Sequence, residues 1–378
     1  MRLGIFTYES LHCNFTNYGT VLQAWALQKA IDNMRIPKLE TILINYCAEN
    51  MLDKNPYDPV QNMWDLDPEI RKQCKAMLPA IELNYERIAQ FYLNEMKMTS
   101  CEYNKFNLEC LQEENIDIFV CGSDSIWDVS EFGIDKAFWA DYDFMKGKSL
   151  AYAPSFQDSF EYLMEVDEEK LRALLNNYVT IGIRDQKPLE KVQEMCSVKV
   201  EKVCDPTMLL ATESYSELIE KSTSVAPYIL YYSRRYNPNM ERFVYYLAKK
   251  KSLRVIEISL RACNSDRAEM RYDAGAQEFL SLISEAEYVV TNSFHCIIFS
   301  LHFEKKFWAF TRQNCVGKIV ELLESVGLTK RLISTENYDE VVDEDSIDYL
   351  SVKKIMESQR QNSLLFLRQS IMHLVENL

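Results

Sequence analysis

Short apolar runs along the chain alternate with longer stretches in which apolar residues recur at helical spacing. The short runs predict strands, because a short continuous apolar run suits a strand buried on both faces. These runs lie at residues 3–7, 41–45, 117–121, 149–153, 179–183 and 200–204, and then at 228–232, 254–258, 288–291 and 306–310. Helical spacing covers stretches such as 20–33, 82–98, 168–177 and 240–250. Repeated alternation of this kind predicts parallel sheets with helices on both faces.

The strand-like runs form two series, separated by residues 211–226, which are rich in Ser, Thr and Glu. The chain has 378 residues, which is too long for one ordinary core and suits two domains. We therefore expect an α/β fold of two doubly wound, Rossmann-like domains facing a cleft. The expected domains are residues 1–215 and 216–345. Residues 48–75 are expected to leave the first domain as an excursion, and residues 346–378 to form one or more helices that pack back across the interface.

Composition narrows the class of protein. Apolar residues make up 47% of the chain and charged residues 26%, as in soluble globular proteins. No apolar run is long enough to span a bilayer, and the N-terminal residues are expected to form a strand and not a signal peptide. The net charge of −15 argues against nucleic acid as a partner. The eleven cysteines form no CxxC pair and no Cys/His metal spacing, which favours reduced thiols in the cytoplasm.

The loops that follow the predicted strands hold the polar residues of interest, because open parallel sheets bind ligands at the carboxyl ends of their strands. After the first run, Asn17, Tyr18, Gly19 and Thr20 precede an apolar helix. Asn17 or Thr20 can cap that helix, Gly19 lets the backbone approach a ligand, and the free N–H groups of the first turn favour an anion. A simple cap and turn without a ligand is the alternative.

Two further loops carry charged residues. Ser123 and Asp124 follow the run at 117–121 and could bind sugar hydroxyls, since a carboxylate accepts hydrogen bonds from two hydroxyl groups; the alternative is a helix cap. Arg184 follows the run at 179–183 and could hold a phosphate or carboxylate with its two parallel N–H groups. The alternative is an ion pair with Asp185 or a neighbouring Glu.

The stretch NSFHCIIFSLHF, residues 292–303, places one of the chain's four histidines at the start of an apolar helix. His295 follows the predicted strand at 288–291, through Ser293 and Phe294. It would lie in the first helical turn, next to free backbone N–H groups that attract an anionic ligand. Its imidazole could then donate a hydrogen bond or a proton to a substrate. A half-buried histidine that is satisfied by protein contacts is the alternative.

Six motifs occur in one order: NYGTVLQAWALQ, GSDSIWD, LAYAPSF, IGIRDQ, VCDPTMLL and NSFHCIIFSLHF. The ordered set resembles the polysaccharide pyruvyl transferase family, from Leu3 to about Arg331. The resemblance implies two Rossmann-like domains in the GT-B manner. It implies transfer of the pyruvyl group of phosphoenolpyruvate to a sugar as a cyclic ketal, with donor-binding residues at Arg184 and His295.

The sequence departs from the family pattern at three positions. Some branches have an arginine two residues before the histidine, where this chain has Ser293. Arg234 or Arg235, after the run at 228–232, is the candidate replacement. Cys296 and Ser125 stand where glycine and glutamine are common, which leaves the acceptor open.

On this resemblance, His295 is expected to protonate the enol carbon of phosphoenolpyruvate or to stabilise the departing phosphate, because histidine suits proton transfer near neutral pH. No metal or organic cofactor is expected. The first domain is expected to bind a sugar or lipid-linked glycan acceptor and the second domain the donor. The protein is expected in the cytoplasm, which is compatible with contact at the inner membrane surface. Two rival functions stay open: a GT-B glycosyltransferase that uses a nucleotide sugar, and a non-catalytic glycan-binding member of a glycan-assembly complex.

Overall fold

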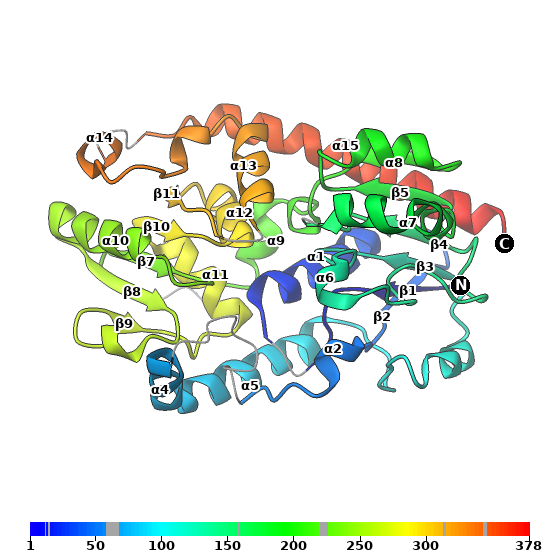
Figure 1. Ribbon diagram of the computed structural model, residues 1–378, viewed down its shortest axis with the longest axis horizontal. Helices are drawn as coiled ribbons and strands as arrows, with labels where there is room; N and C mark the ends of the chain where they lie inside the picture. The colour runs from blue at the N-terminus through cyan, green and yellow to red at the C-terminus, as the bar shows by residue number, and fades with distance from the viewer. Residues whose placement is uncertain are drawn as a thin grey trace. The chain divides into compact units, whose positions relative to one another are not determined.

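The computed structural model describes residues 1–11, 13, 16–57, 68–157, 159–219, 226–312, 315–342 and 346–378. The chain forms two compact units (Figure 1). Unit 1 contains residues 1–54, 92–210 and 357–378, and unit 2 contains residues 55–91 and 211–356.

Unit 1 is built on a six-stranded parallel sheet with the order β2-β1-β3-β4-β5-β6. All six strands fall on the predicted runs, with ends that shift by at most two residues: β1 (Arg2–Phe6), β2 (Glu40–Leu43), β3 (Ile118–Cys121), β4 (Ser149–Tyr152), β5 (Thr180–Ile183) and β6 (Lys199–Lys202). The helices are α1 (Tyr18–Asn33), α2 (Glu49–Leu52), α6 (Val129–Phe132), α7 (Ser159–Leu175), α8 (Leu189–Met195) and the part of α15 (Tyr349–Glu376) from Glu357 onward. Short 3₁₀ helices cover Leu108–Glu114 and Pro206–Met208.

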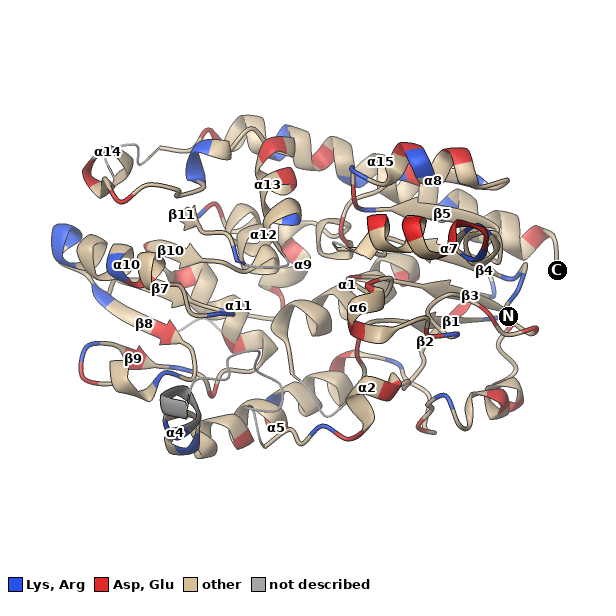
Figure 2. Ribbon diagram, viewed as in Figure 1, with Lys and Arg blue, Asp and Glu red and all other residues tan. Residues whose placement is uncertain are grey.

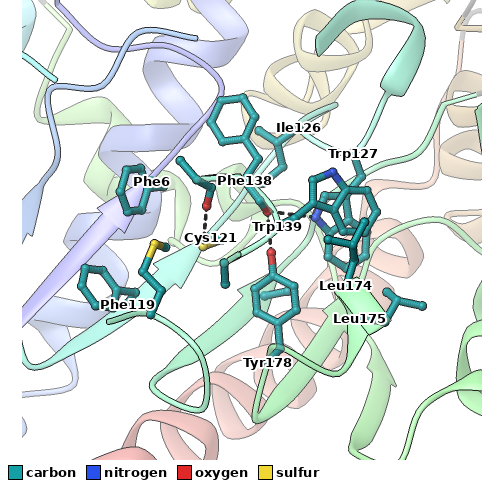
Figure 3. Packing of buried hydrophobic residues seen from close by; sticks show 14 of the residues in the cluster. Phe6, Phe119, Cys121, Ile126, Trp127, Phe138, Trp139, Leu174, Leu175 and Tyr178 are labelled. Atoms are coloured by element: carbon teal, nitrogen blue, oxygen red, sulfur yellow. Dashed lines mark hydrogen bonds between the residues drawn. The ribbon is translucent and has the colours of Figure 1, made fainter. Parts of the chain in front are cut away.

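The core of unit 1 is rich in aromatic side chains around β3 and β4 (Figure 3). Trp127 and Trp139 stack with ring centres 4.8 Å apart and nearly parallel planes. The carbonyl oxygen of Phe138 accepts hydrogen bonds from Trp127 Nε1 at 3.1 Å and from the Tyr178 hydroxyl. These bonds satisfy polar atoms that burial would otherwise leave without hydrogen-bonding partners. They also hold Trp127, in the loop after β3, in place.

Helix α15 covers part of the unit 1 sheet at a glycine. A Cβ atom on Gly182, in the centre of β5, would lie 2.6 Å from Cε1 of Phe366 in α15. The backbone N–H of Cys204 donates to Ser363 Oγ at 2.9 Å, and Arg368 donates to the carbonyl of Met34 at 2.8 Å. The absence of a side chain at residue 182 therefore lets this helix approach the sheet closely.

Unit 2 is built on a five-stranded parallel sheet with the order β11-β10-β7-β8-β9. Its strands are β7 (Tyr228–Tyr232), β8 (Arg254–Ile258), β9 (Glu269–Met270), β10 (Tyr288–Thr291) and β11 (Lys306–Ala309). Its helices are α4 (Pro68–Ala76), most of α5 (Leu78–Glu95), α9 (Thr212–Ser216), α10 (Pro238–Lys251), α11 (Ala276–Glu285), α12 (Phe294–His302), α13 (Val316–Ser325) and α14 (Tyr338–Val342). Short 3₁₀ helices cover Ala262–Asn264 and Thr329–Arg331.

The units do not follow the chain as simply as the sequence suggests. The sequence places residues 1–215 in the first domain, but residues 55–91 belong to unit 2 in the structure. Arg87 pairs there with Asp273 at 2.8 Å, and Asn84 Nδ2 donates to the carbonyl of Ala274 at 2.6 Å. The sequence also sets residues 346–378 apart, whereas residues 357–378 are an integral part of unit 1. Local patterning contains no information about these long-range partners.

Candidate functional site

Each sheet has a point where the strand order reverses, and open parallel sheets bind ligands there, at the carboxyl ends of the strands. In unit 1 the reversal lies between β1 and β3, and in unit 2 it lies between β7 and β10. The loops that follow these four strands hold most of the candidate residues that the sequence singles out.

The loop after β1 leads into α1, and its polar residues mainly organise that helix. Asn17 is the N-cap, and its Oδ1 accepts from the backbone N–H of Gly19 at 3.1 Å. Gly19 therefore lies inside the first turn, after Tyr18. The Thr20 hydroxyl is buried and donates to the carbonyl of Asn17 at 2.8 Å. Of the two caps that the sequence allowed, the structure has Asn17.

Gln23 connects the two loops that flank the reversal in unit 1. It is fully buried in α1, and its Nε2 donates to the Thr7 hydroxyl, directly after β1. Its Oε1 accepts from the backbone N–H of Ser123, directly after β3, at 3.3 Å. This residue is not among the candidates that the sequence singles out. The available signal was a polar side chain on a helix that is otherwise almost wholly apolar, because a buried polar group must find hydrogen-bonding partners.

A second link crosses the same reversal. The Tyr8 hydroxyl, two residues beyond β1, donates to Oε1 of Glu131 in α6, which follows β3. Burial raises the pKa of the Glu131 carboxyl, and the nearby charge of Asp128 raises it further, although the bond from Tyr8 acts in the opposite direction. A carboxyl group of raised pKa therefore lies on the edge where the sequence predicts the acceptor.

Arg184 is the centre of a buried ion cluster. Its guanidinium lies 2.6 Å from Asp205 Oδ2 and 3.2 Å from Asp124 Oδ1, while Asp185 is 4.0 Å away. Burial acts to lower the pKa of Arg184, but Asp124 and Asp205 outweigh it, so the pKa is raised. The sequence named Asp185 or a neighbouring Glu as the alternative partner. Instead the closest carboxylates come from the loop after β3 and from the residue three positions beyond β6. Binding of a donor anion by Arg184 stays a prediction, and that anion would compete with both carboxylates.

In unit 2, Ser293 and His295 lie directly beyond β10. Ser293 is the N-cap of α12, and its Oγ accepts from the backbone N–H of Cys296 at 3.4 Å. The helix begins at Phe294, so His295 is in its first turn, as the sequence predicts. The Phe294 and His295 rings meet edge to face with centres 5.2 Å apart. All nine residues of α12 are buried, and His295 is 6% exposed.

Asn292 holds the loop after β7 against the end of β10. Its Oδ1 accepts from the backbone N–H of Arg234 at 2.9 Å, and its Nδ2 donates to the carbonyl of Arg235 at 2.8 Å. Both arginines are thereby fixed beside the loop that carries Ser293 and His295. The sequence offers Arg234 or Arg235 as the replacement for the arginine missing at residue 293, and the structure brings both to that edge.

A third arginine reaches the same edge from the loop after β11. Arg312 was missed from the sequence because it lies in no motif, and its proximity depends on β11 being the neighbour of β10. A fourth basic residue, Lys318 in α13, lies with its Nζ 5.5 Å from the centre of the Phe294 ring. Acidic residues are frequent elsewhere, for example on α7 and α8 in unit 1 and on α13 in unit 2, shown in red in Figure 2. This basic edge therefore contrasts with the net charge of the chain.

The model of the polysaccharide pyruvyl transferase family matches residues 17–314, which is most of the chain. The chain belongs to this family. The match spans Asn17, the loop after β3, Arg184, His295 and Arg312. The resemblance that the sequence motifs indicated is thus confirmed, and membership supports polysaccharide pyruvyl transfer as the general activity.

Solved structures that are similar to this pyruvyl transferase family member show its fold. UDP-GlcNAc 2-epimerase from Neisseria meningitidis, bound to UDP-GlcNAc, superposes with a TM-score of 0.54 at 8% identity, covering 98% of this chain and 99% of that one. MnaA from S. aureus, in a co-structure with UDP, gives 0.51 at 13% identity, covering 96% and 90%. At these identities the likeness establishes only the fold. With the two parallel sheets it confirms the predicted GT-B-like α/β architecture. No curated protein sequence matches the chain.

In this pyruvyl transferase family member, a substitution at Asp124 distinguishes a role in acceptor binding from a purely structural role. Asp124 has a φ of +64°, which Asn tolerates better than Ala, so Asp124→Asn is the appropriate change. If Asp124 binds acceptor hydroxyls, the acceptor KM should rise about 10-fold or more, because a hydrogen bond to a charged group contributes roughly 1.5–3 kcal/mol. The KM for phosphoenolpyruvate should change little. Steady-state kinetics with each substrate varied in turn measures both constants.

Asp205→Asn is the matched control for this change. Asp205 shares Arg184 with Asp124, but its side chain is fully buried and cannot reach a ligand. It should cost stability and leave the acceptor KM unchanged. Equal effects of the two substitutions on both KM values would show that Asp124 acts only through the ion cluster.

Proposed function

We propose that the protein transfers the pyruvyl group of phosphoenolpyruvate to two hydroxyls of a sugar in a polysaccharide or its precursor, forming a cyclic ketal and releasing phosphate. In this reaction two C–O bonds form at C2 of the donor and the bond from C2 to the phosphate oxygen breaks. Of the two hydroxyl protons, one ends on the methylene carbon, which becomes a methyl group, and the other leaves with phosphate. The reaction needs no redox partner, and we propose no metal or organic cofactor.

Given membership of the family, the main observation in support of this proposal is the position of His295. The residue lies in the first turn of α12, directly beyond β10, at the strand reversal of unit 2. The loop that presents Arg234 and Arg235 is held beside it by Asn292. A proton donor next to basic side chains suits an anionic substrate that must be protonated on carbon. We assign protonation of the methylene carbon to His295, a step that contributes on the order of 10²- to 10⁴-fold when an acid is correctly placed.

The remaining roles are divided between the two units. We assign donor binding to unit 2, through Ser293, Phe294 and Arg234, with Arg184 of unit 1 as a further donor contact. We assign acceptor binding to unit 1, through the loops after β1 and β3. The residues concerned are Asn17, Tyr18, Gly19, Thr20, Ser123 and Asp124.

Incubation of the protein with phosphoenolpyruvate and a panel of glycans tests the proposal. The expected result is phosphate release that depends on the glycan, together with a mass gain of one pyruvate ketal on the glycan. Release of a nucleotide from a nucleotide sugar, with glycan extension, would instead identify a glycosyltransferase. Glycan binding without turnover of either donor would identify a non-catalytic member of a glycan-assembly complex.

We place the reaction in the cytoplasm, where phosphoenolpyruvate is made, with a sugar or lipid-linked glycan as acceptor. Among the helices that the structure describes, none combines the length and apolar character that a membrane crossing requires. The eleven cysteines all lie within the described residues and form no disulfide bond there. Subcellular fractionation of the host, followed by detection of the protein, tests the location; recovery from an extracytoplasmic fraction would contradict it.

A further inference from the structure

The basic edge of unit 2 is built from three neighbouring strands. Strands β11, β10 and β7 are adjacent and parallel, so their carboxyl ends share one edge of the sheet. Arg312 lies three residues beyond β11, His295 four residues beyond β10, and Arg234 and Arg235 follow β7. All of these residues belong to unit 2, so the arrangement does not depend on unit 1.

Hydrogen bonds between the loops fix this arrangement. Besides the two bonds that Asn292 makes to the backbone of Arg234 and Arg235, Asn237 Nδ2 donates to the carbonyl of Thr311 at 3.5 Å. That bond joins the loop after β7 to the residue that precedes Arg312. The backbone positions of the three arginines are therefore set before any ligand binds, which reduces the entropic cost of binding.

The positive charges of the three arginines repel one another. Burial lowers the pKa of the Arg312 guanidinium, and the positive charges of Arg234 and Arg235 lower it further. Cys315 and Tyr232 act in the opposite direction and raise this pKa, but the lowering effects are larger, and none of these four groups is a carboxylate. Within the described part of the chain, the buried Nε of Arg312 has no hydrogen-bonding partner. A desolvated cation among like charges is costly and is stabilised by an anion.

We propose that Arg312, together with Arg234 and Arg235, forms a phosphate-binding site at the carboxyl edge of the unit 2 sheet, beside His295. Arginine suits this ligand because its planar fork donates two parallel hydrogen bonds to phosphate oxygens. The assignment of that phosphate to phosphoenolpyruvate rests on the proposed function, whereas phosphate binding itself does not. In the proposed reaction, Arg312 stabilises the negative charge on phosphate as the bond to C2 breaks. It thus supplies a positive charge in place of the arginine that some branches of the family have at the position of Ser293.

Inorganic phosphate is the probe for this site. The unaltered protein should bind phosphate in isothermal titration calorimetry, and phosphate should raise its Tm and inhibit competitively with phosphoenolpyruvate. Arg312→Met should weaken phosphate binding by about 10- to 100-fold, because it removes charge-assisted hydrogen bonds. The KM for phosphoenolpyruvate should rise by a similar factor, and the acceptor KM should stay unchanged. Arg312→Lys, which keeps the charge without the fork, should fall between the two.

Thermal stability distinguishes binding from a structural role. Without phosphate, Arg312→Met should have the same Tm as the unaltered protein or a higher one, because the substitution relieves repulsion among like charges; a structural arginine would lower Tm when removed. Arg242→Met is the matched control, since Arg242 is an exposed arginine of the same unit on α10, paired with Glu336. It should leave phosphate binding intact.

The outcomes for the site and for the donor are separable. If phosphate does not bind the unaltered protein, or if Arg312→Met binds it as tightly, the site is wrong even when phosphoenolpyruvate is turned over. If phosphate binding depends on Arg312 but phosphoenolpyruvate is not a donor, the site stands and the proposed function fails. A lower Tm of Arg312→Met in phosphate-free buffer would also overturn the site.

Discussion

Replacing His295 by asparagine is expected to lower turnover by about 10²-fold or more while the protein stays folded. Asparagine has a similar size and can hydrogen bond, but it cannot deliver a proton near neutral pH. His295 lies in the first turn of α12 at 6% exposure, where the polar amide of asparagine replaces the imidazole without introducing a charge. The measurement is kcat with phosphoenolpyruvate and an active acceptor, accompanied by circular dichroism to establish folding.

His302 is the control histidine of the same helix. It is equally buried, and its Nδ1 lies 3.3 Å from the Thr212 hydroxyl, with the Tyr215 ring 5.0 Å away between centres. It is about two turns farther from the end of β10, so roughly 10 Å away along the helix. His302→Asn should cost stability at most and keep turnover. A folded His295→Asn protein with near-normal turnover would contradict the assignment and direct attention to His12, which lies outside the described residues.

Replacing Arg184 by glutamine is expected to destabilise the protein by about 3–5 kcal/mol, because it leaves two buried carboxylates without their cation. The side chains of Asp124 and Asp205 are only 6% and 0% exposed, so water compensates little for the lost guanidinium. The measurement is the midpoint of urea unfolding together with Tm.

The double variant Arg184→Gln/Asp205→Asn tests whether buried carboxylates without a cation cause this loss of stability. Removing one of the two orphaned charges should recover part of the lost stability, which appears as a coupling between the two sites in a double-mutant cycle. A single Arg184→Gln variant that unfolds at nearly the same urea concentration as the unaltered protein would show that the cluster contributes little. Such a result would strengthen the prediction that Arg184 serves the donor.

The strands were predictable because their sequence signal is local. Each strand in the centre of a sheet is a continuous apolar run, as for Tyr228–Tyr232, whose five residues are all buried. The two-residue edge strand Glu269–Met270 has no such signal. Glu269 is charged and exposed, and Met270 is a single, partly exposed apolar residue. The positions of Ser293 and His295 followed from the same local signal, because a residue directly after a strand has only one end of the sheet to occupy.

The partners of the site residues were less predictable, because they depend on strand order. Arg184 pairs most closely with Asp205, 21 positions away, and with Asp124, 60 positions away, whereas its sequence neighbour Asp185 is the most distant of the three carboxylates, at 4.0 Å. Asn292 and Arg312 become meaningful only when β7, β10 and β11 are known to be adjacent. An apolar pattern predicts that strands exist, but hydrogen-bond pairing between strands determines which loops meet.

The division of unit 1 into three stretches of chain bears on how the protein folds during its synthesis. The ribosome releases the chain from its N-terminus, so residues 211–356 of unit 2 emerge before residues 357–378 of unit 1. Until then the face of β5 at Gly182 has no Phe366 to cover it, and the backbone N–H of Cys204 has no Ser363 to bind. Unit 2, although it is encoded mainly in the second half of the sequence, therefore has all of its residues outside the ribosome before unit 1 does.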